Sequence, residues 1–297
     1  MRWELDVRLA TLARYRIGGP ADRLARPQSI GELRDIVTEL DGAPHEVLGT
    51  GANVLIAEAG VRGSVLVLGG EFAHLEVEDG AIRAGAATKL PALAGAARKS
   101  ARVGFHFLEA VPGTVGGGLR MNAGSREDWL WDRVDWVEAV TPAAKVVRLA
   151  AHDARPSYRH VSVPGGWVFV GARFTTTDGE PDAVRESHFR FRDRKVNDQV
   201  YDLPSVGSTW KNPDEPHPSA WQVVDEVGMR GATSGGAQIA ERHANFIVNL
   251  GEARADDVLD LMIETRKRAH ERFGFWLEPE IRLWGFEPER LAEVGAA

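Results

Sequence analysis

The chain has 297 residues, 43% of them hydrophobic, which is enough to bury a sizeable core in two or three domains. Its formal net charge of −7, with both signs mixed, gives no electrostatic reason to expect nucleic acid, and the absence of cysteine excludes disulfides and thiolate chemistry. No apolar run is long enough to span a bilayer and the N-terminus lacks a signal peptide's apolar core, so we expect a cytoplasmic protein with no membrane partner.

The first 70 residues predict a small α/β unit. Ser29 is a suitable N-cap with Glu32 three residues later, and apolar residues at helical spacing predict a helix over 29–40. Short strands are expected at 47–49 and 65–68, each ending in a glycine turn. A helix followed by short strands is typical of α/β units.

From Glu71 onward the sequence becomes richer in strands. The turn Asp79-Gly80 between alternating apolar residues predicts a hairpin over 75–82, and residues 90–99 have helical composition. Further strands are expected at 134–140, 146–149 and 167–174.

The last third begins with a change of composition. Residues 193–218 are polar and proline-rich, which predicts a domain junction or a functional loop. Beyond it, Asp256 is expected to cap a helix with an apolar face that ends at Gly274.

Three glycine-rich turns carry most of the functional information: 18–21, 49–53, and the run 111–118 that continues to Ser125. Dense glycines leave main-chain N–H groups uncovered, and bare amides in tight turns that run into a helix hold pyrophosphates. Taken alone, Gly49-Thr50-Gly51 is weak evidence for a phosphate site, because most glycine turns after strands only connect elements. The long run favours a nucleotide-type ligand, and its spacing fits neither G-x-G-x-x-G nor the P-loop.

The segment 204–213 has the composition of a surface loop, yet two features favour a function. Lys211 and Asn212 closely follow Ser208, so a hydroxyl, an ammonium and an amide can face one site, and Trp210 provides an apolar anchor. Ser208 is not in a G-x-S-x-G elbow, so acyl transfer is unsupported. A serine hydroxyl could instead give a proton to a strongly basic carbanion or enolate.

Two further charged positions are candidates. Glu280 precedes an apparent strand and is expected to be held more rigidly than Glu278, although a solvated turn is the plain alternative. Arg159 could clamp a carboxylate through two hydrogen bonds, or form an ordinary surface pair. His243 lacks metal-ligand spacing, so no metal site is expected.

Together these motifs resemble one family over nearly the whole chain: the UDP-N-acetylenolpyruvoylglucosamine reductases, flavoproteins that make UDP-N-acetylmuramate for peptidoglycan. The matching segments are 15–21, 48–53 and 111–122 for the FAD loops, 204–213 for the catalytic serine loop, and 238–249 and 277–282 for the C-terminal motifs. Three positions depart from the family's usual residues: Thr50-Gly51-Ala52 replaces Gly-Gly-Ser, Trp210 replaces Phe, and His160-Val161 replaces Asp-Ser.

The resemblance implies an α+β protein, in which a two-subdomain FAD-binding fold of the vanillyl-alcohol-oxidase type is joined to a C-terminal α/β substrate-binding domain. The expected division is 1–68 and 69–195 for the two FAD subdomains, with 276–297 returning to the second, and 196–275 for the substrate domain. The short interval between Arg159 and Ser208 is similar to the family's second type, which lacks a tyrosine-bearing loop over the substrate.

The resemblance also assigns roles to residues. Ser208 would be the proton donor, Arg159 and Glu280 would polarise the substrate carboxylate, and Lys211, Asn212 and Gln238 would bind substrate. Arg192-Asp193 offers a competing match to the arginine motif, but it lies too close to the serine loop. The residues expected to bind FAD are Tyr15, Ile17, Gly18, Gly49, Thr50, Gly51, Ala52, Asn53, Val54, Val111, Pro112, Gly113, Thr114, Gly116, Gly117, Asn122, Ala123 and Gly124.

The implied reaction uses NADPH to reduce a non-covalently bound FAD, which passes a hydride from N5 to C3 of UDP-N-acetylenolpyruvoylglucosamine, while the proton goes to C2. The implied role lies in cell-wall biogenesis and hence in cell shape, the cell cycle and division. We expect only small-molecule partners and a monomer. Two alternatives stay open: another oxidoreductase of a small alcohol or sugar on the same FAD fold, and a non-catalytic flavin-binding module.

Overall fold

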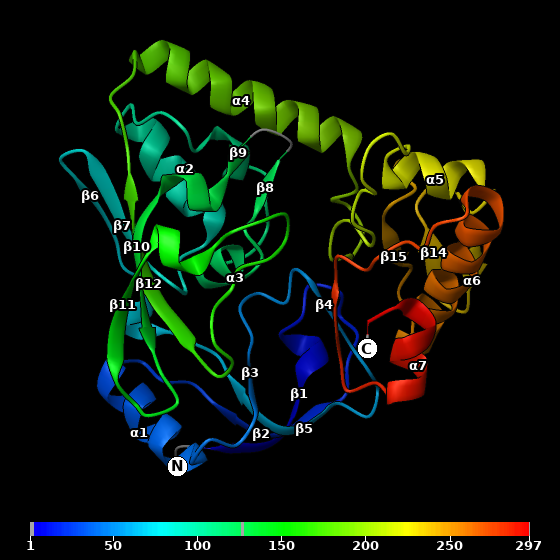
Figure 1. Ribbon diagram of the computed structural model, residues 1–297, viewed down its shortest axis with the longest axis horizontal. Helices are drawn as coiled ribbons and strands as arrows, with labels where there is room; N and C mark the ends of the chain where they lie inside the picture. The colour runs from blue at the N-terminus through cyan, green and yellow to red at the C-terminus, as the bar shows by residue number, and fades with distance from the viewer. Residues whose placement is uncertain (1–2, 126–127, 297) are drawn as a thin grey trace. The chain divides into compact units, whose positions relative to one another are not determined.

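The computed structural model describes residues 3–125 and 128–296 (Figure 1). Its packing divides the chain into two units. The first unit holds the described residues of segments 3–4, 24–49 and 64–197, and the second holds those of 5–23, 50–63 and 198–296. Each unit has its own hydrophobic core.

The first unit contains a five-stranded sheet in the order β11-β10-β12-β7-β6, whose strand pairs are all antiparallel. These strands are β6 (Leu75–Glu78), β7 (Ala81–Gly85), β10 (Val134–Val140), β11 (Val146–Ala150) and β12 (Val168–Thr175). The predicted hairpin and the three later strands are therefore confirmed. The remaining strands wholly in this unit are β3 (His45–Val47), β8 (Gly124–Ser125) and β9 (Asp128–Trp129).

Helices cover this sheet with apolar side chains. The helices are α1 (Ile30–Leu40), α2 (Leu90–Lys99), α3 (Val115–Arg120) and α4 (Pro181–Asp198), with 3-10 turns η2 (Gly70–Ala73), η3 (His106–Leu108), η4 (Leu130–Arg133) and η5 (Ala151–Ala154). Leu93 of α2 and Leu119 of α3 share one core cluster with Phe174 of the sheet. Leu33 of α1 packs in a second cluster with Val170.

The start of α1 follows the predicted cap in most respects. Ser29 accepts a hydrogen bond from the N–H of Glu32 at 3.2 Å, as expected of an N-cap. The Glu32 carboxylate accepts from the N–H of Gln28 at 2.7 Å rather than from Ser29, so the reciprocal half of the box is displaced by one residue.

The helix α4 was not predicted, and its last turns occupy part of the segment 193–218 that was expected to be a junction. Charged residues dominate its sequence, but Val184, His188 and Phe191 recur at helical spacing and are buried. It packs near α2, since the guanidinium of Arg98 lies 4.8 Å from the ring centre of Phe189. Irregular chain follows it, and the change of packing unit falls at 197/198.

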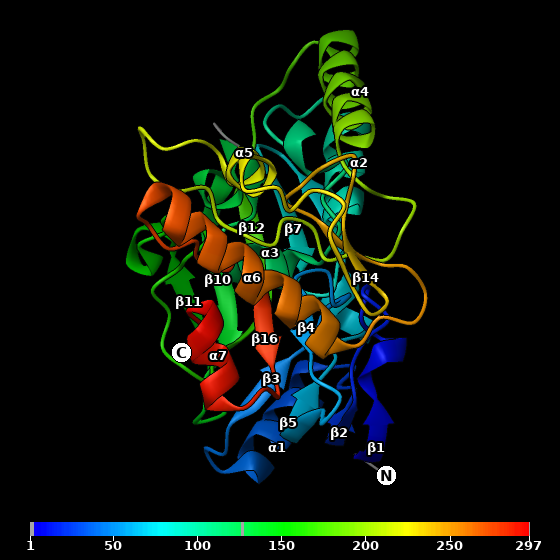
Figure 2. The same ribbon diagram turned by 90° about the vertical axis from the view of Figure 1, so that its right-hand side faces the viewer.

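The second unit is built around the long helix α6. Its helices are α5 (Ala220–Glu226), α6 (Ala255–Phe273) and α7 (Pro288–Val294), with the 3-10 turn η1 (Leu9–Thr11). Its strands are β4 (Val54–Ile56), β13 (Thr233–Ser234), β14 (Ala237–Ile239), β15 (Ile247–Asn249) and β16 (Arg282–Trp284). The chain passes between the units within β1 (Glu4–Arg8), β2 (Pro20–Ala25) and β5 (Val61–Leu66). Figure 2 shows α7 beside α6.

The ends of α6 agree with the sequence at one terminus and differ slightly at the other. Gly274 ends the helix in the left-handed conformation at φ +78°, as predicted. At the start, Asp257 rather than Asp256 accepts the N–H of Arg254, at 2.9 Å.

The described part of the C-terminal segment packs differently from the prediction that 276–297 returns to 69–195. β16 pairs in parallel with β4, and Leu277, Ile281 and Val294 lie in the core of the second unit. Packing gives two units, and the division into three domains stays a prediction. The partner of a three-residue strand depends on distant packing, which its local pattern does not encode.

Among the described residues, no helix has both the length and the apolar character needed to cross a membrane.

Candidate active site

The glycine turn at residues 49–53, called the first glycine turn from here on, has unused hydrogen-bond donors. Its main-chain N–H groups make no hydrogen bond to any residue that the structure describes. The Thr50 hydroxyl is also buried and has no partner among those residues. Gly51 has φ +59°, and a Cβ there would lie 2.5 Å from the Cα of Ala13. The turn therefore offers several donors at close range to an anionic group, as a pyrophosphate requires.

The second glycine loop has a different structure from the one its composition predicts. Val115, Gly116 and Gly117 form the first turn of α3, and their N–H groups donate to Thr88 O, Ala86 O and Thr114 Oγ1. The premise that these amides are bare is therefore wrong. Within the described chain, only the N–H groups of Gly113 and Thr114 in this stretch have no such partner.

The glycines of α3 serve close packing instead. A Cβ on Gly118 would lie 3.0 Å from Leu90 Cδ2, and one on Gly116 would lie 3.1 Å from Ala86 Cβ. Within the first unit, Gly49 also lies close to Thr114, because a Cβ on Gly49 would lie 2.7 Å from Thr114 Oγ1. FAD contacts by Gly116 and Gly117 stay predictions.

Several predicted FAD residues of the second unit have buried side chains. The Tyr15 hydroxyl donates to Ile247 O at 2.8 Å, and burial raises the pKa of Tyr15 far above its usual value. Ile17 also lies in the core, and Val54 is buried in β4. Gly18 has φ +136°. Only the main chain of these four positions is open to a cofactor role, which stays a prediction.

The predicted FAD residues after α3 lie close to Arg159. Asn122 is buried; its amide donates to Ser157 O at 3.1 Å and accepts from the N–H of Trp131 at 3.3 Å. Ala123 and Gly124 follow it into β8, where Gly124 pairs with Trp129. Val111 and Pro112, before α3, are partly buried.

The serine loop is anchored as predicted. Trp210 is 2% exposed and lies in the core of the second unit, so tryptophan fills this position without disruption. Gly207, in the left-handed conformation at φ +86°, precedes Ser208. Ser208 is half-buried, and no residue in the described ranges hydrogen-bonds its hydroxyl.

Two segments far apart in sequence hold the chain immediately after Ser208. On one side, the N–H of Glu280 donates to Thr209 O at 2.8 Å. On the other, Thr209 N donates to Asn245 O at 2.8 Å, and the side-chain amide of Asn245 both accepts from Trp210 N and donates to Trp210 O, each at 2.9 Å. Ser208 and Glu280 are thus connected through the single residue Thr209.

Sequence reasoning did not single out Asn245. The available signal was an asparagine placed directly before the apolar run Phe246–Val248, where a buried amide needs partners.

The first glycine turn is tied to Glu280 as well. The Asn53 amide donates to Glu280 O at 3.1 Å, and Arg282 N donates to Asn53 O at 3.0 Å. Within the second unit, a predicted FAD residue therefore contacts the main chain of a predicted catalytic residue.

Arg159 belongs to the first unit, where it occupies a tight turn. Ser157 and His160 exchange main-chain hydrogen bonds around it, at 2.9 and 3.2 Å, and Arg159 has φ +56°. Its guanidinium lies 5.4 Å from the ring centre of Trp129 and donates to Asn122 O at 3.4 Å. The unusual His160-Val161 pair thus fits a defined turn, with Val161 buried.

The predicted substrate residues all have partners in the second unit. Lys211 Nζ lies 3.1 Å from Glu278 Oε2, and the Asn212 side chain accepts from Ala220 N at 3.0 Å, at the start of α5. Gln238 donates to Gly231 O at 3.3 Å. Their substrate roles stay predictions.

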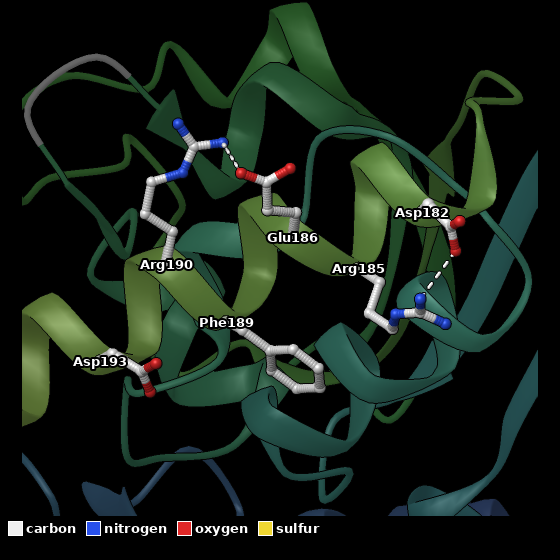
Figure 3. A pocket seen from close by; sticks show the side chains of 6 residues that line it. All are labelled: Asp182, Arg185, Glu186, Phe189, Arg190 and Asp193. Carbon is white, nitrogen blue, oxygen red and sulfur yellow. Dashed lines mark ion pairs between the residues drawn. The ribbon is translucent and has the colours of Figure 1, made fainter.

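The competing arginine, Arg192, lies on α4 and pairs with the adjacent Asp193 at 2.8 Å. A recess on this helix is lined by six side chains (Figure 3), including the ion pairs Arg185–Asp182 at 2.8 Å and Arg190–Glu186 at 3.7 Å. Such pairs at helical spacing are typical of a solvated helix face. In residues 3–125 and 128–296, no group of histidine and acidic side chains could hold a metal ion.

Comparisons with known proteins identify the family. Residues 21–150 match the family described as FAD binding domain, and residues 198–284 match UDP-N-acetylenolpyruvoylglucosamine reductase, C-terminal domain. The chain is 38% identical to the UDP-N-acetylenolpyruvoylglucosamine reductase of Anaplasma marginale, over 91% of this chain and 90% of that protein. It is 37% identical to that of Acidiphilium cryptum, over 94% and 90%.

The chain belongs to the UDP-N-acetylenolpyruvoylglucosamine reductase family. The crystal structure of the reductase from Thermus caldophilus superposes with a TM-score of 0.84 at 33% identity, covering 96% of this chain and 100% of that one. The predicted family, its α+β FAD-binding fold and its class, oxidoreductase, are confirmed. For this reductase, the FAD match spans both glycine loops, and the C-terminal match spans Ser208, Asn245 and Glu280.

Proposed function

We propose that this reductase uses NADPH, through non-covalently bound FAD, to convert UDP-N-acetylenolpyruvoylglucosamine to UDP-N-acetylmuramate. The single observation that carries the proposal is the hydrogen bond from Glu280 N to Thr209 O, which connects the two predicted catalytic residues of one unit. The names of relatives that match over most of the chain support the substrate.

The residues present fit FAD. When bound, FAD supplies the hydride chemistry. The N–H groups of residues 49–53 and the buried Thr50 hydroxyl would hold its diphosphate, because they are donors without acceptors in the described chain. Gly113 and Thr114 would add two more amides.

Ser208 would deliver the proton to C2 of the enolpyruvyl group, after hydride reaches C3. The carbanion character at C2 makes a weak acid sufficient, and solvent would restore the serine proton. Arg159 would contribute paired N–H donors to the substrate carboxylate, where negative charge develops. Glu280 would support the same charge, and it can do so only as a donor, in its protonated form.

The test separates the two half-reactions under anaerobic conditions. NADPH should bleach the flavin of both wild type and Ser208→Ala at similar rates. Reoxidation by UDP-N-acetylenolpyruvoylglucosamine should be about 10²–10⁴-fold slower in Ser208→Ala, because a general acid is missing. Ser205→Ala is the matched control, since Ser205 is a buried serine of the same loop.

Wild-type reoxidation in Ser208→Ala would disprove the proton-donor role. Rapid reoxidation by oxygen with none by the UDP substrate would favour an oxidase on the same fold. A yellow protein that NADPH does not reduce would favour a flavin-binding module.

A further inference from the structure

Asn245 is a buried polar residue whose side-chain amide bonds both main-chain groups of one residue, Trp210. It is 4% exposed, its Oδ1 accepts from Trp210 N, and its Nδ2 donates to Trp210 O, each at 2.9 Å. This donor–acceptor pair reproduces what a neighbouring strand would supply. Its own main-chain carbonyl adds the bond from Thr209 N.

The opposite side of this short stretch pairs with the segment that carries Glu280. Thr209 O accepts from Glu280 N, Lys211 N donates to Glu278 O at 2.9 Å, and Trp210 and Pro279 form an antiparallel bridge. The main chain at 209–211 is therefore held from both sides while it is almost fully buried at Thr209 and Trp210.

Ser208 lies between this doubly bonded stretch and Gly207. Gly207 adopts a left-handed conformation, and a Cβ there would meet nothing within 4 Å. The main-chain hydrogen bonds that fix the chain next to Ser208 are those at Thr209 and Trp210, whereas no side chain at position 207 packs against the surroundings.

We propose that Asn245 is a positioning residue that orients Ser208 for proton delivery and fixes its place relative to Glu280. This inference rests on the proposed function. Removing the amide would leave the buried N–H and C=O of Trp210 without partners, so the loop would shift to recover them. A displacement of about 1 Å at a reacting group can cost about 10²-fold in rate.

The first test is Asn245→Ala in the FAD-loaded enzyme, again with separate half-reactions. Flavin reduction by NADPH should stay within about threefold of wild type, while reoxidation by saturating UDP-N-acetylenolpyruvoylglucosamine should slow by about 10²-fold. Met262→Ala is the control, because it removes a fully buried side chain of α6 from the same core. It should slow neither half-reaction selectively.

The second variant, Asn245→Asp, gives a signature that a merely structural role would not. A protonated carboxyl can both accept from Trp210 N and donate to Trp210 O, whereas a carboxylate can only accept. The reoxidation rate of the variant, divided by that of wild type, should therefore rise at least tenfold from about pH 8 to about pH 5.

The same variant has a readout that does not depend on activity. Burial beside a carbonyl should raise the pKa of the new carboxyl above its unfolded value. Its contribution to stability is then present below the unfolded pKa and lost as the pH rises through the folded one. The melting temperature of the variant, relative to wild type, should fall as pH rises.

Several results would overturn the inference. These are wild-type reoxidation in Asn245→Ala, equal slowing of both half-reactions, a Met262→Ala variant with the same selective defect, or a pH-independent rate ratio in Asn245→Asp. If Asn245→Ala does not fold, the Asn245→Asp ratio decides. If the UDP substrate fails to reoxidise even the wild-type enzyme, the proposed function is wrong, and this inference is wrong with it.

Discussion

At Gly51 the main chain takes a conformation that an L-residue adopts only under strain. Its φ is +59°, and the space where a Cβ would point is filled by the main chain of Ala13. The neighbouring N–H groups of the turn make no hydrogen bond within the described chain. Glycine here therefore has two effects: it permits the turn, and it keeps the amides accessible.

Gly51→Ala should consequently weaken FAD binding at least tenfold and destabilise the protein by about 1–3 kcal/mol. The comparison is Gly42→Ala, which carries the cost of a positive φ (+78°) but meets no atom within 4 Å and lies after α1. Fluorescence titration with FAD measures the affinity and urea unfolding the stability. Equal FAD affinity in the two variants would exclude the first glycine turn as a diphosphate site.

The helix α4 carries a buried histidine, His188, paired with Glu109, and the proposed reaction does not use this pair. His188 is 1% exposed, and its Nδ1–H donates to Glu109 at 2.9 Å, since a carboxylate can only accept. Its Nε2 is buried without a partner in the described chain. Burial lowers the pKa of His188, opposed by Glu109 and reinforced by His106 and Arg98.

This arrangement predicts an acid-sensitive contact between α4 and its neighbours. The unfolded chain takes up a proton near the ordinary histidine pKa while the folded His188 resists it, so the free energy of unfolding falls as pH drops from 7 to 5. His188→Gln keeps an N–H donor for Glu109 but cannot titrate, so its stability should fall less. The difference between the free energies of unfolding of the two proteins can change by at most about 1.4 kcal/mol per pH unit. The free energy of unfolding is measured by urea titration at each pH. An equal fall for wild type and His188→Gln between pH 7 and pH 5 would contradict the prediction.

Local sequence patterns predicted several elements but not the contacts among them. The hairpin 75–82, α2 and the end of α6 at Gly274 followed from local periodicity and turn residues. The free amides of the first glycine turn, and their absence in α3, could not follow from composition, because they depend on which carbonyls lie nearby. Likewise Ser208 and Glu280 were candidates from their local sequence and from the resemblance, whereas Asn245 was identified only by its hydrogen-bond partners in the structure.

Each of the two units carries some of the predicted catalytic and cofactor-binding residues. The first unit holds Arg159 and the Thr114 loop, and the second holds Ser208, Asn245 and Glu280. A ligand that binds only the folded protein stabilises it in proportion to the logarithm of its concentration over Kd.

FAD should therefore stabilise the folded apoprotein by about 2.7 kcal/mol at a hundredfold excess over Kd, which raises its melting temperature. Riboflavin, which lacks the diphosphate, should stabilise much less if residues 49–53 bind that group. Calorimetry with both ligands measures the difference. Equal stabilisation by FAD and riboflavin would show that the amides of this turn contribute nothing.

The pairing of residues 209–211 with the segment 278–280 also sets an order of events during synthesis. Lys211 and Glu278 are 67 positions apart, so the serine loop is synthesised well before the segment that pairs with it. Until those later residues emerge, the buried peptides of Thr209 and Trp210 have only Asn245 to bond with on one side. The loop that carries Ser208, the predicted proton donor, therefore gains its full set of main-chain hydrogen bonds only after almost the whole chain has been translated.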